Sequence, residues 1–476
     1  MVGVVFSSII FLSVFLPIFL LVYYASGKSN VVVLLFSLVF YAWGGPNLLP
    51  LLLFYIIWNY VFGLLIEKAS THRRAILSLG LAGNLAGLLY FKYLGFVAGQ
   101  ISTALSLFNV TSLPEFHIVL PLGISFFSFQ AISYLIDIYR GDVKAQKSCL
   151  TFATYKAMFP QLIAGPIVRY SQLAEELDAR SVDAERLSYG ILIFVVGLAQ
   201  KTLIANPLAA PADQIFALQP EQLTVATAWL GVLCYTGQIY FDFCGYSNIA
   251  IGPGHMMGFT LPPNFNRPYI AQSATEFWRR WHISLSTWFR DYLYIPLGGN
   301  RKSERRTYFN LATVFVLCGL WHGASWIFLL WGVYWGILLA AERAGLGRIV
   351  QGLWRPLRHV YLLLAVMFGW IIFRADTPTH AVAIMKAMGG FGAGNSFDTP
   401  IEQYFGRSVA ITLAVAACAS ALPSSPAKIP PLDLRELSRV RLAAGIAART
   451  AVLALVIVCL FSVGSGSYNP FIYFRF

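Results

Sequence analysis

Long runs of apolar residues, separated by short polar loops, make up most of this chain. A helix that spans a membrane needs about 20 mostly apolar residues, and by this rule the pattern predicts about twelve segments. Several of them are short or interrupted by Gly or Pro, which is typical of broken or re-entrant helices around a buried site. The segments are Val4–Tyr24, Val31–Ala42, Leu48–Ile66, Ala75–Val97, Ile118–Tyr139, Tyr189–Ala205, Thr224–Phe243, Leu311–Leu320, Trp326–Ala341, Val360–Phe373, Ser408–Ala421 and Ala451–Val463. Val4–Tyr24 is too long for a signal-peptide core and no small-residue cleavage site follows it, so we expect it to be retained as a span.

The composition agrees with a membrane protein. Hydrophobic residues make up 58% of the 476 residues and charged residues 12%, whereas a soluble domain usually has about 25% charged residues. This argues against a soluble enzyme, a disordered chain and a disulfide scaffold. The net charge of +13 comes from few charges in total, which fits basic cytoplasmic loops better than nucleic-acid binding.

The polar segments indicate how the chain is organised. Three of them are rich in Lys and Arg, so we place them in the cytoplasm. They are Lys68–Arg74, Arg140–Lys147 and Arg267–Arg306. The segment Pro423–Arg449 is predicted to be a late connecting loop. The six cysteines form no CxxC pair and are interpreted as buried hydrophobic residues, so no metal site is expected. We expect one membrane domain over residues 1–476.

The third basic segment has an unusual pattern. Ser273 and Glu276 form a capping-box pattern, which predicts that a helix begins there. An apolar stripe at helical spacing predicts that it continues through residue 292; the stripe is Phe277, Trp281, Leu285, Trp288 and Tyr292. An amphipathic helix at the membrane surface is one interpretation. A surface anchor does not need His282, however, and the turn-rich residues 294–301 that follow could present backbone N–H groups and arginines to an anionic ligand.

His322 interrupts two apolar segments, in Leu320-Trp-His-Gly-Ala-Ser-Trp326. A histidine at membrane depth is costly and is a functional candidate by default. Imidazole has an unperturbed pKa of about 6.5, so it can take a proton from a hydroxyl and pass it to a leaving group. A core histidine bonded to a backbone carbonyl is the alternative. His322 is the first candidate for a chemical role.

Several of these stretches, taken together over residues 1–375, resemble the membrane-bound O-acyltransferase family. The bacterial branch that contains the alginate O-acetylation membrane protein is the more similar one, and the D-alanyl transferases of teichoic acids are more distant. The core motifs fall within about residues 115–375. The resemblance rests on Tyr41-Ala-Trp43, Pro121-Leu-Gly-Ile-Ser-Phe126, Phe159-Pro-Gln-Leu-Ile-Ala-Gly-Pro-Ile167, Tyr240-Phe-Asp-Phe243, Gly245-Tyr-Ser247, Asn264-Phe265, Arg267-Pro-Tyr269, residues 276–286, residues 290–300 and Leu320-Trp-His-Gly323.

The resemblance implies a fold, a reaction and a set of residues. The fold would be a ring-like bundle of about 11–13 transmembrane or re-entrant helices around a through-membrane tunnel. The family histidine corresponds to His322 and the second functional histidine to His282. The donor would be cytoplasmic acetyl-CoA, used as a substrate with no permanently bound cofactor. Residues expected to bind it are Arg279, Arg280, Trp281, Asn300 and Arg301.

The resemblance also implies partners and a location. The protein would lie in membrane lipid as a multi-pass protein of the bacterial inner membrane. Its acceptor would be an extracytoplasmic polysaccharide of the alginate or cellulose type, reached with a periplasmic esterase-like (SGNH-type) acetyltransferase.

Alternatives to this reading remain open at this point. Where close relatives read Asp-Phe-Ser-Gly-Tyr-Ser-Asp, this chain has Asp242-Phe-Cys-Gly-Tyr-Ser-Asn248, so the substrate is not fixed. The donor could be an acylated carrier protein, as in the D-alanyl transferases. A transporter or flippase also fits many spans with buried polar residues, and a third possibility is a structural subunit of a polymer-secretion complex.

Overall fold

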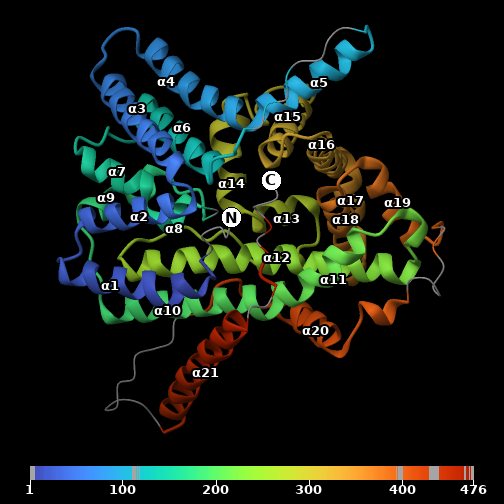
Figure 1. Cartoon of the computed structure of the whole chain (residues 1–476). Coiled ribbons are helices and arrows are strands. Elements are labelled where there is room, and N and C mark those ends of the chain that lie inside the picture. Colours follow the sequence, from blue (N-terminus) through green and yellow to red (C-terminus); the bar gives the residue numbers. More distant parts are fainter. Residues whose placement is uncertain are drawn as a thin grey trace.

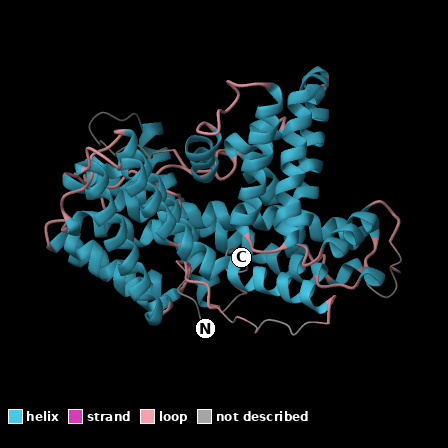
Figure 2. Cartoon of the chain, turned by 90° about the horizontal axis from the view of Figure 1, so that it is seen from above, coloured by secondary structure: helices cyan, strands magenta, loops and turns pink. Residues whose placement is uncertain are grey.

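The computed structural model describes residues 6–109, 114, 116, 118–163, 165–392, 394, 400–427, 439–465, 468–470 and 472. Every regular element in these ranges is a helix, as Figure 2 shows. The all-α fold predicted from the hydrophobic pattern is therefore confirmed. The helices are α1 (Leu16–Ala25), α2 (Asn30–Gly44), α3 (Leu49–Lys68), α4 (Arg73–Leu88), α5 (Leu94–Ser106), α6 (Ile124–Arg140), α7 (Cys149–Ala157), α8 (Phe159–Leu162), α9 (Tyr170–Asp178), α10 (Ala184–Ala199), α11 (Asn206–Phe216), α12 (Val225–Met256), α13 (Ala274–Arg280), α14 (Ile283–Phe289), α15 (Glu304–His322), α16 (Trp326–Ala341), α17 (Gly347–Gly352), α18 (Arg355–Arg374), α19 (Pro378–Met388), α20 (Arg407–Ala421) and α21 (Arg439–Gly464).

Short π-helical and 3₁₀ turns join or extend several of these helices. The π-helical turns are Phe11–Phe15, Leu89–Tyr93, Gln200–Ala205, Arg290–Tyr294 and Glu342–Leu346. The 3₁₀ turns are Pro46–Leu48, Pro220–Gln222, Pro268–Ile270 and Ile401–Gln403. Because a π turn continues the helix on either side of it, α4 and α5 form one rod and α10 and α11 form another.

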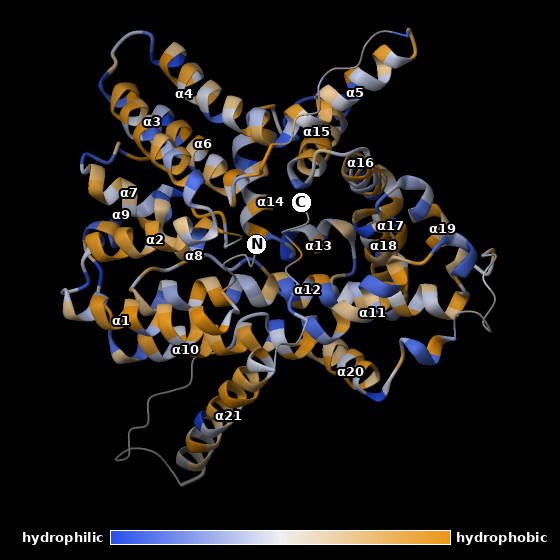
Figure 3. Cartoon of the chain, viewed as in Figure 1, coloured by the Kyte–Doolittle hydropathy of each residue, from blue (hydrophilic) through white to orange (hydrophobic). Residues whose placement is uncertain are grey.

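The long apolar helices identify a multi-pass membrane protein. Six helical stretches of the described chain are long and apolar enough to cross a bilayer, and three shorter helices are also apolar. Figure 3 shows hydrophobic residues along α3, α10 and α21. The long stretches are Pro46–Lys68, Arg73–Ser106, Ala184–Phe216, Trp326–Gly352, Arg355–Arg374 and Gly445–Gly464. Length and composition do not decide how many of the shorter helices cross or re-enter, so the expected number of 11–13, the ring and the tunnel stay predictions.

Most predicted segments coincide with observed helices, and Trp326–Ala341 matches α16 at both ends. Several boundaries were wrong; the segment predicted over Tyr189–Ala205, for example, continues to Phe216. The segment predicted from Ile118 becomes helical only at Ile124, because Gly123 adopts a left-handed conformation with φ of 75°. The segment predicted to end at Phe243 continues to Met256 as α12. The late polar loop gives way to helix at Arg439, where alanine-rich sequence favours helix over loop.

Helix α12 forms the centre of the molecule (Figure 1), with α10 packed along it. Glycines make the close approach of the two backbones possible. A Cβ atom on Gly197 would lie 2.6 Å from the carbonyl oxygen of Gly245, and one on Gly190 would lie 2.7 Å from that of Gly252. Small residues at such contacts are the usual means by which membrane helices pack closely. This packing carries α12 past the predicted end at Phe243.

A buried ion pair links the centre of α12 to the late part of the chain. Lys201 Nζ lies 2.6 Å from Asp242 Oδ1, and both side chains are 1% exposed. The same two side chains also contact backbone groups near residue 470. Lys201 donates a hydrogen bond to the carbonyl of Pro470. Asp242 Oδ2 accepts from the backbone N–H of Ile472 at 2.9 Å. The pair therefore binds the backbone carbonyl of Pro470 and the backbone N–H of Ile472.

Breaking this pair is expected to destabilise the protein. Asp242→Leu leaves the Lys201 ammonium buried without its countercharge, which costs roughly 3–5 kcal/mol in other proteins. We expect a large fall in the thermal unfolding midpoint of the detergent-purified protein. The double variant Lys201→Met/Asp242→Leu removes both charges and should recover much of the loss. A single variant as stable as the wild type would contradict the role of the pair.

Candidate active site

The helix predicted to begin at Ser273 is broken at His282. Ser273 does cap it, with its Oγ accepting from the N–H of Glu276 at 3.1 Å. The helix ends at Arg280, however, and a second one begins at Ile283. His282 lies between them in the left-handed conformation, with φ of 43° and ψ of 54°. The prediction of one continuous helix was therefore wrong. The periodic apolar stripe does not reveal a positive φ at a residue other than glycine.

Hydrogen bonds from a neighbouring extended segment hold the break in place. Ile283 N–H donates to the carbonyl of Asn264 at 2.9 Å. The Asn264 amide donates to Ser247 Oγ at 3.1 Å, and its oxygen accepts from Ser284 Oγ at 2.9 Å. Ser284 Oγ accepts in turn from the N–H of Ile167. Four of the motifs singled out in the sequence thus form one buried network around the turn of His282.

The start of α13 is anchored from the other side by Glu342. Its carboxylate accepts from the backbone N–H groups of Ala274 at 2.6 Å and Thr275 at 3.0 Å. A carboxylate at a helix N-terminus satisfies backbone donors that have no partner within the helix. The aromatic face of α13 is therefore held against α16, where Phe277 stacks on Trp335 with ring centroids 5.3 Å apart.

His322 is the last residue of α15, which forms a tight hairpin with α16. Glycines again allow the two helix backbones, here those of α15 and α16, to approach closely. A Cβ atom on Gly319 would collide with the carbonyl oxygen of Phe328, and one on Gly332 would collide with that of Phe315. The helix turn that carries His322 is thus pressed directly on the backbone of α16.

The structure brings the two predicted histidines together. Their ring centroids are 6.4 Å apart, and the residues are 0% (His282) and 6% (His322) exposed. Aromatic rings surround them: Trp331 lies 5.0 Å from His322, and Phe243 lies 4.7 Å from His282. The arrangement is a buried pair of imidazoles with apolar walls.

A narrow cavity of about 10 Å³ adjoins His322. Its wall includes Trp281, Trp331, Trp370 and Ile472, so the late segment of the chain reaches the candidate site. The buried indole N–H of Trp331 has no hydrogen-bond partner among the described residues. A buried donor left unpaired is costly, and Trp331 is one of the residues that line the cavity. Because the cavity is so small, the through-membrane tunnel stays a prediction.

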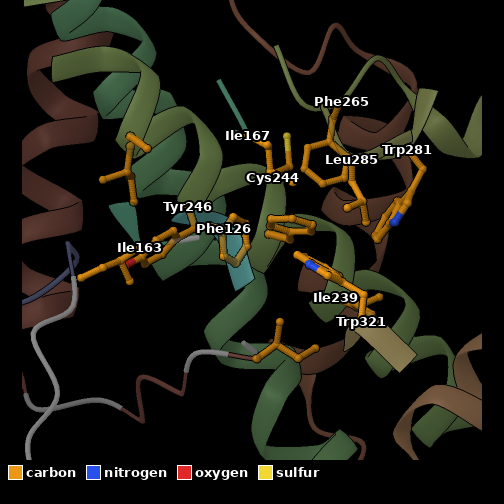
Figure 4. Packing of buried hydrophobic residues seen from close by; sticks show 14 of the residues in the cluster. Phe126, Ile163, Ile167, Ile239, Cys244, Tyr246, Phe265, Trp281, Leu285 and Trp321 are labelled. Atoms are coloured by element: carbon orange, nitrogen blue, oxygen red, sulfur yellow. The ribbon is translucent and has the colours of Figure 1, made fainter. Parts of the chain in front are cut away.

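Side chains distant in sequence form the surrounding cluster. Figure 4 shows Phe126 of α6, Ile239 and Cys244 of α12, Leu285 of α14 and Trp321 of α15 packed together. Sequence patterns could not have placed Ile472 here, because it lies far along the chain from His322 and in no recognisable motif.

A second and larger cavity lies beside the same helices. It has a volume of about 610 Å³ and is lined by Arg279, Arg290 and Ser286 from the basic segment. Its apolar wall includes Phe315 and Cys318 of α15. Cys318 precedes His322 by four residues, which is about 6 Å along a helix axis. The cavity therefore extends from cationic groups to within one helical turn of His322.

Comparison with known proteins decides the family. The model of the membrane-bound O-acyltransferase family matches residues 145–375, the part of the chain that contains both histidines. The probable alginate O-acetylase AlgI of Pseudomonas putida is 42% identical over 488 residues, covering 99% of this chain and 100% of that protein. The chain belongs to the membrane-bound O-acyltransferase family. It is thus an enzyme that transfers acyl groups, which sets aside the transporter and the structural subunit.

More distant relatives modify other polymers. The peptidoglycan O-acetyltransferase of Helicobacter pylori is 35% identical, covering 70% of this chain and 69% of that protein. The teichoic acid D-alanyltransferase of Bacillus subtilis is 27% identical, covering 56% of this chain and 71% of that protein. These two names show that related chains serve different polymers and carry different acyl groups.

The predicted donor-binding residues of this acyltransferase have different surroundings. Arg279 lines the larger cavity. Arg280 instead forms an ion pair with Glu276 at 2.8 Å and donates to the carbonyl of Asn266. Trp281 is buried and faces the His322 cavity. Asn300 and Arg301 lie on an exposed turn and are not among the residues that line the cavity in the described chain.

The three basic loops are neighbours in the enzyme, joined by hydrogen bonds. Arg73 donates to the carbonyl of Tyr139 at 3.3 Å, and Arg140 donates to that of Asp291 at 3.2 Å. Burial acts to raise the pKa of Asp291, but hydrogen bonds from Arg290 and Arg169 outweigh it and hold this pKa below its usual value. The ionised Asp291 thereby orients Arg290 beside the larger cavity. Sequence reasoning missed Arg290 as a ligand candidate, although it belongs to the same basic run.

Two further lysines were overlooked. Lys92 and Lys201 lie in apolar segments, where the rule for charges at membrane depth should have drawn attention to them. Lys92 donates to the carbonyls of Trp321 and His322, so it lies directly beside the candidate site. Among the described residues no group of His, Cys, Asp and Glu is arranged to hold a metal ion.

The Asn264 network provides a test of how the His282 turn is held. Asn264→Leu removes a hydrogen-bond partner from the hydroxyls of Ser247 and Ser284. Each buried polar group left unpaired lowers the free energy of unfolding by about 1–3 kcal/mol. We expect a lower unfolding midpoint in detergent and lower transferase activity per folded molecule. Asn47→Leu, at an exposed position of the turn Pro46–Leu48, is the matched control. Equal stability of both variants would contradict the structural role of Asn264.

Proposed function

We propose that this enzyme passes an acetyl group from cytoplasmic acetyl-CoA to an extracytoplasmic polysaccharide of the alginate type. The cavity that extends from Arg279 and Arg290 to within one turn of His322 carries this proposal. The match to alginate O-acetylases along nearly the whole chain supports the choice of acetyl group and polymer. We place the enzyme in the bacterial inner membrane with its basic loops in the cytoplasm.

The larger cavity suits the donor chemically. Coenzyme A carries phosphates at one end and a thioester at the other, so its site needs cations at one end and an apolar passage at the other. Guanidinium groups bind phosphate oxygens through paired, charge-assisted hydrogen bonds. Arg279 and Arg290 supply the cations, while Phe315 and Cys318 supply the apolar wall. The thioester would then lie towards His322.

His322 would act as the general base. The acceptor hydroxyl gives its proton to the imidazole as its oxygen attacks the thioester carbonyl, forming the new C–O bond. Collapse of the tetrahedral intermediate breaks the C–S bond, and the imidazolium returns the proton to the departing thiolate. Proton transfer of this kind contributes about 10²–10⁴-fold to a rate. His282, 6.4 Å away between ring centroids, would orient the thioester.

The acceptor side is proposed from the relatives and from the position of the site. A buried histidine in a membrane enzyme can serve two compartments only if acetyl enters from one face and leaves at the other. A periplasmic esterase-like acetyltransferase would complete the transfer to the polymer.

Replacing the proposed base tests the mechanism. In His322→Ala no side chain takes the proton, so transfer of label from [¹⁴C]acetyl-CoA to polymer in membranes should fall by about 10²-fold or more. His359→Ala, on α18, is the control histidine and should retain activity. Full transfer by His322→Ala at a normal membrane level would eliminate His322 as the base.

The donor site has a separate test. Arg279→Ala and Arg290→Ala each remove one phosphate ligand, so the KM for acetyl-CoA should rise by roughly 10- to 100-fold, in line with the loss of about 1.5–3 kcal/mol for a charged hydrogen bond. The exposed Arg305→Ala is the control of equal charge. If acetyl-CoA never serves as a donor while an acylated carrier protein does, the proposed donor is wrong and the carrier-protein alternative holds.

A further inference from the structure

The backbone carbonyls at the end of α15 have unusual hydrogen-bond partners. The last turn of a helix has carbonyls that lack partners within the helix, and at the buried end of α15 they need partners from the protein itself. Here the carbonyl of Gly319 accepts from Gly323 N–H at 3.3 Å. That of Leu320 accepts from the hydroxyl of Tyr93 at 2.7 Å. Those of Trp321 and His322 both accept from the ammonium of Lys92.

Two consecutive residues of another span thus satisfy three carbonyls of this turn. Lys92 and Tyr93 lie in the π-helical turn Leu89–Tyr93 of the rod Arg73–Ser106. The positive charge also faces the negative end of the α15 dipole, which is a favourable placement. Lys92 further lies 5.7 Å from the ring of Trp321. Isolated π turns inside helices occur frequently at functional sites.

The contacts continue along the same side of the rod. Phe96 packs against Trp326 with centroids 5.8 Å apart, and Gln100 accepts from the Trp326 indole at 2.9 Å. Positions 92, 96 and 100 are four residues apart and so share one helix face. We call Lys92, Tyr93, Phe96 and Gln100 the brace face. The rod is otherwise little covered, since 17% of its most apolar window is buried inside the protein.

We propose that the brace face positions His322, with Lys92 and Tyr93 as positioning residues that fix the helix end from which the imidazole projects. This rests on the proposed function of His322 as the base. Lys92 does not need to touch the substrate, because its interactions with Trp321, His322 and Ser125 use its N–H groups. A misplacement of about 1 Å at a reacting group can lower a rate by roughly 10²-fold.

The test combines kinetics with backbone hydrogen exchange in the full-length, detergent-purified enzyme. In Lys92→Met the amides of residues 319–326 should exchange faster. The kcat should fall by roughly 10²-fold with an unchanged KM for acetyl-CoA, since the donor cavity is intact. Lys92→Arg keeps a cation that can donate to two carbonyls and should restore part of kcat. Tyr93→Phe should show the same split with a smaller loss.

Two matched variants separate positioning from folding. Lys156 is another buried lysine that donates to a helix carbonyl, that of Phe127 at 2.6 Å, and Lys156→Met should leave exchange at 319–326 unchanged. Tyr60→Phe likewise removes a hydroxyl bonded to a carbonyl, that of Lys147.

Different results would overturn the role of the brace face and the role of His322 as the base. Unchanged exchange at 319–326 in Lys92→Met overturns the brace face, whatever the activity. Faster exchange with wild-type kcat also overturns it, provided that His322→Ala is inactive. Wild-type turnover by His322→Ala instead overturns the proposed function.

Discussion

Buried helix ends must find hydrogen-bond partners within the protein, and the candidate site of this enzyme is built from two such ends. A backbone group without a partner is costly where water is absent. At the break between α13 and α14, Asn264 and its neighbours supply the partners. At the end of α15, Lys92 and Tyr93 supply them. Each histidine lies at one of these interruptions, where a side chain can project away from a regular helix.

The sequence predicted the type of fold well because apolar length is a strong signal. The ends of α16 were found correctly, since Ser325 and Ala341 border an uninterrupted apolar run. The continuation of α12 to Met256 was missed. The uninterrupted apolar run stops near Phe243, yet Gly252 lies in the helix and packs against α10. Contacts between distant segments, which one sequence does not reveal, decide such boundaries.

The site was predicted in part for a similar reason. His322 and His282 could be named because histidine in an apolar or aromatic run is rare, and the structure places them beside each other. The break at His282 was missed, because it depends on Asn264 and Ser247 from elsewhere in the chain. Of the arginines expected at the donor, Arg279 reaches the larger cavity, whereas Arg280 is engaged by Glu276. The residue type predicts a positive charge, but the neighbouring side chains in the fold decide whether an arginine is free to bind the donor.

The exposure of the rod Arg73–Ser106 has a consequence for the setting in which the enzyme works. A long apolar helix surrounded mostly by acyl chains tilts when the bilayer is thinner than its hydrophobic length. This helix is also tied to the backbone that ends at His322. Bilayer thickness, and with it the acyl-chain length of the surrounding phospholipids, therefore has a mechanical route to the imidazole.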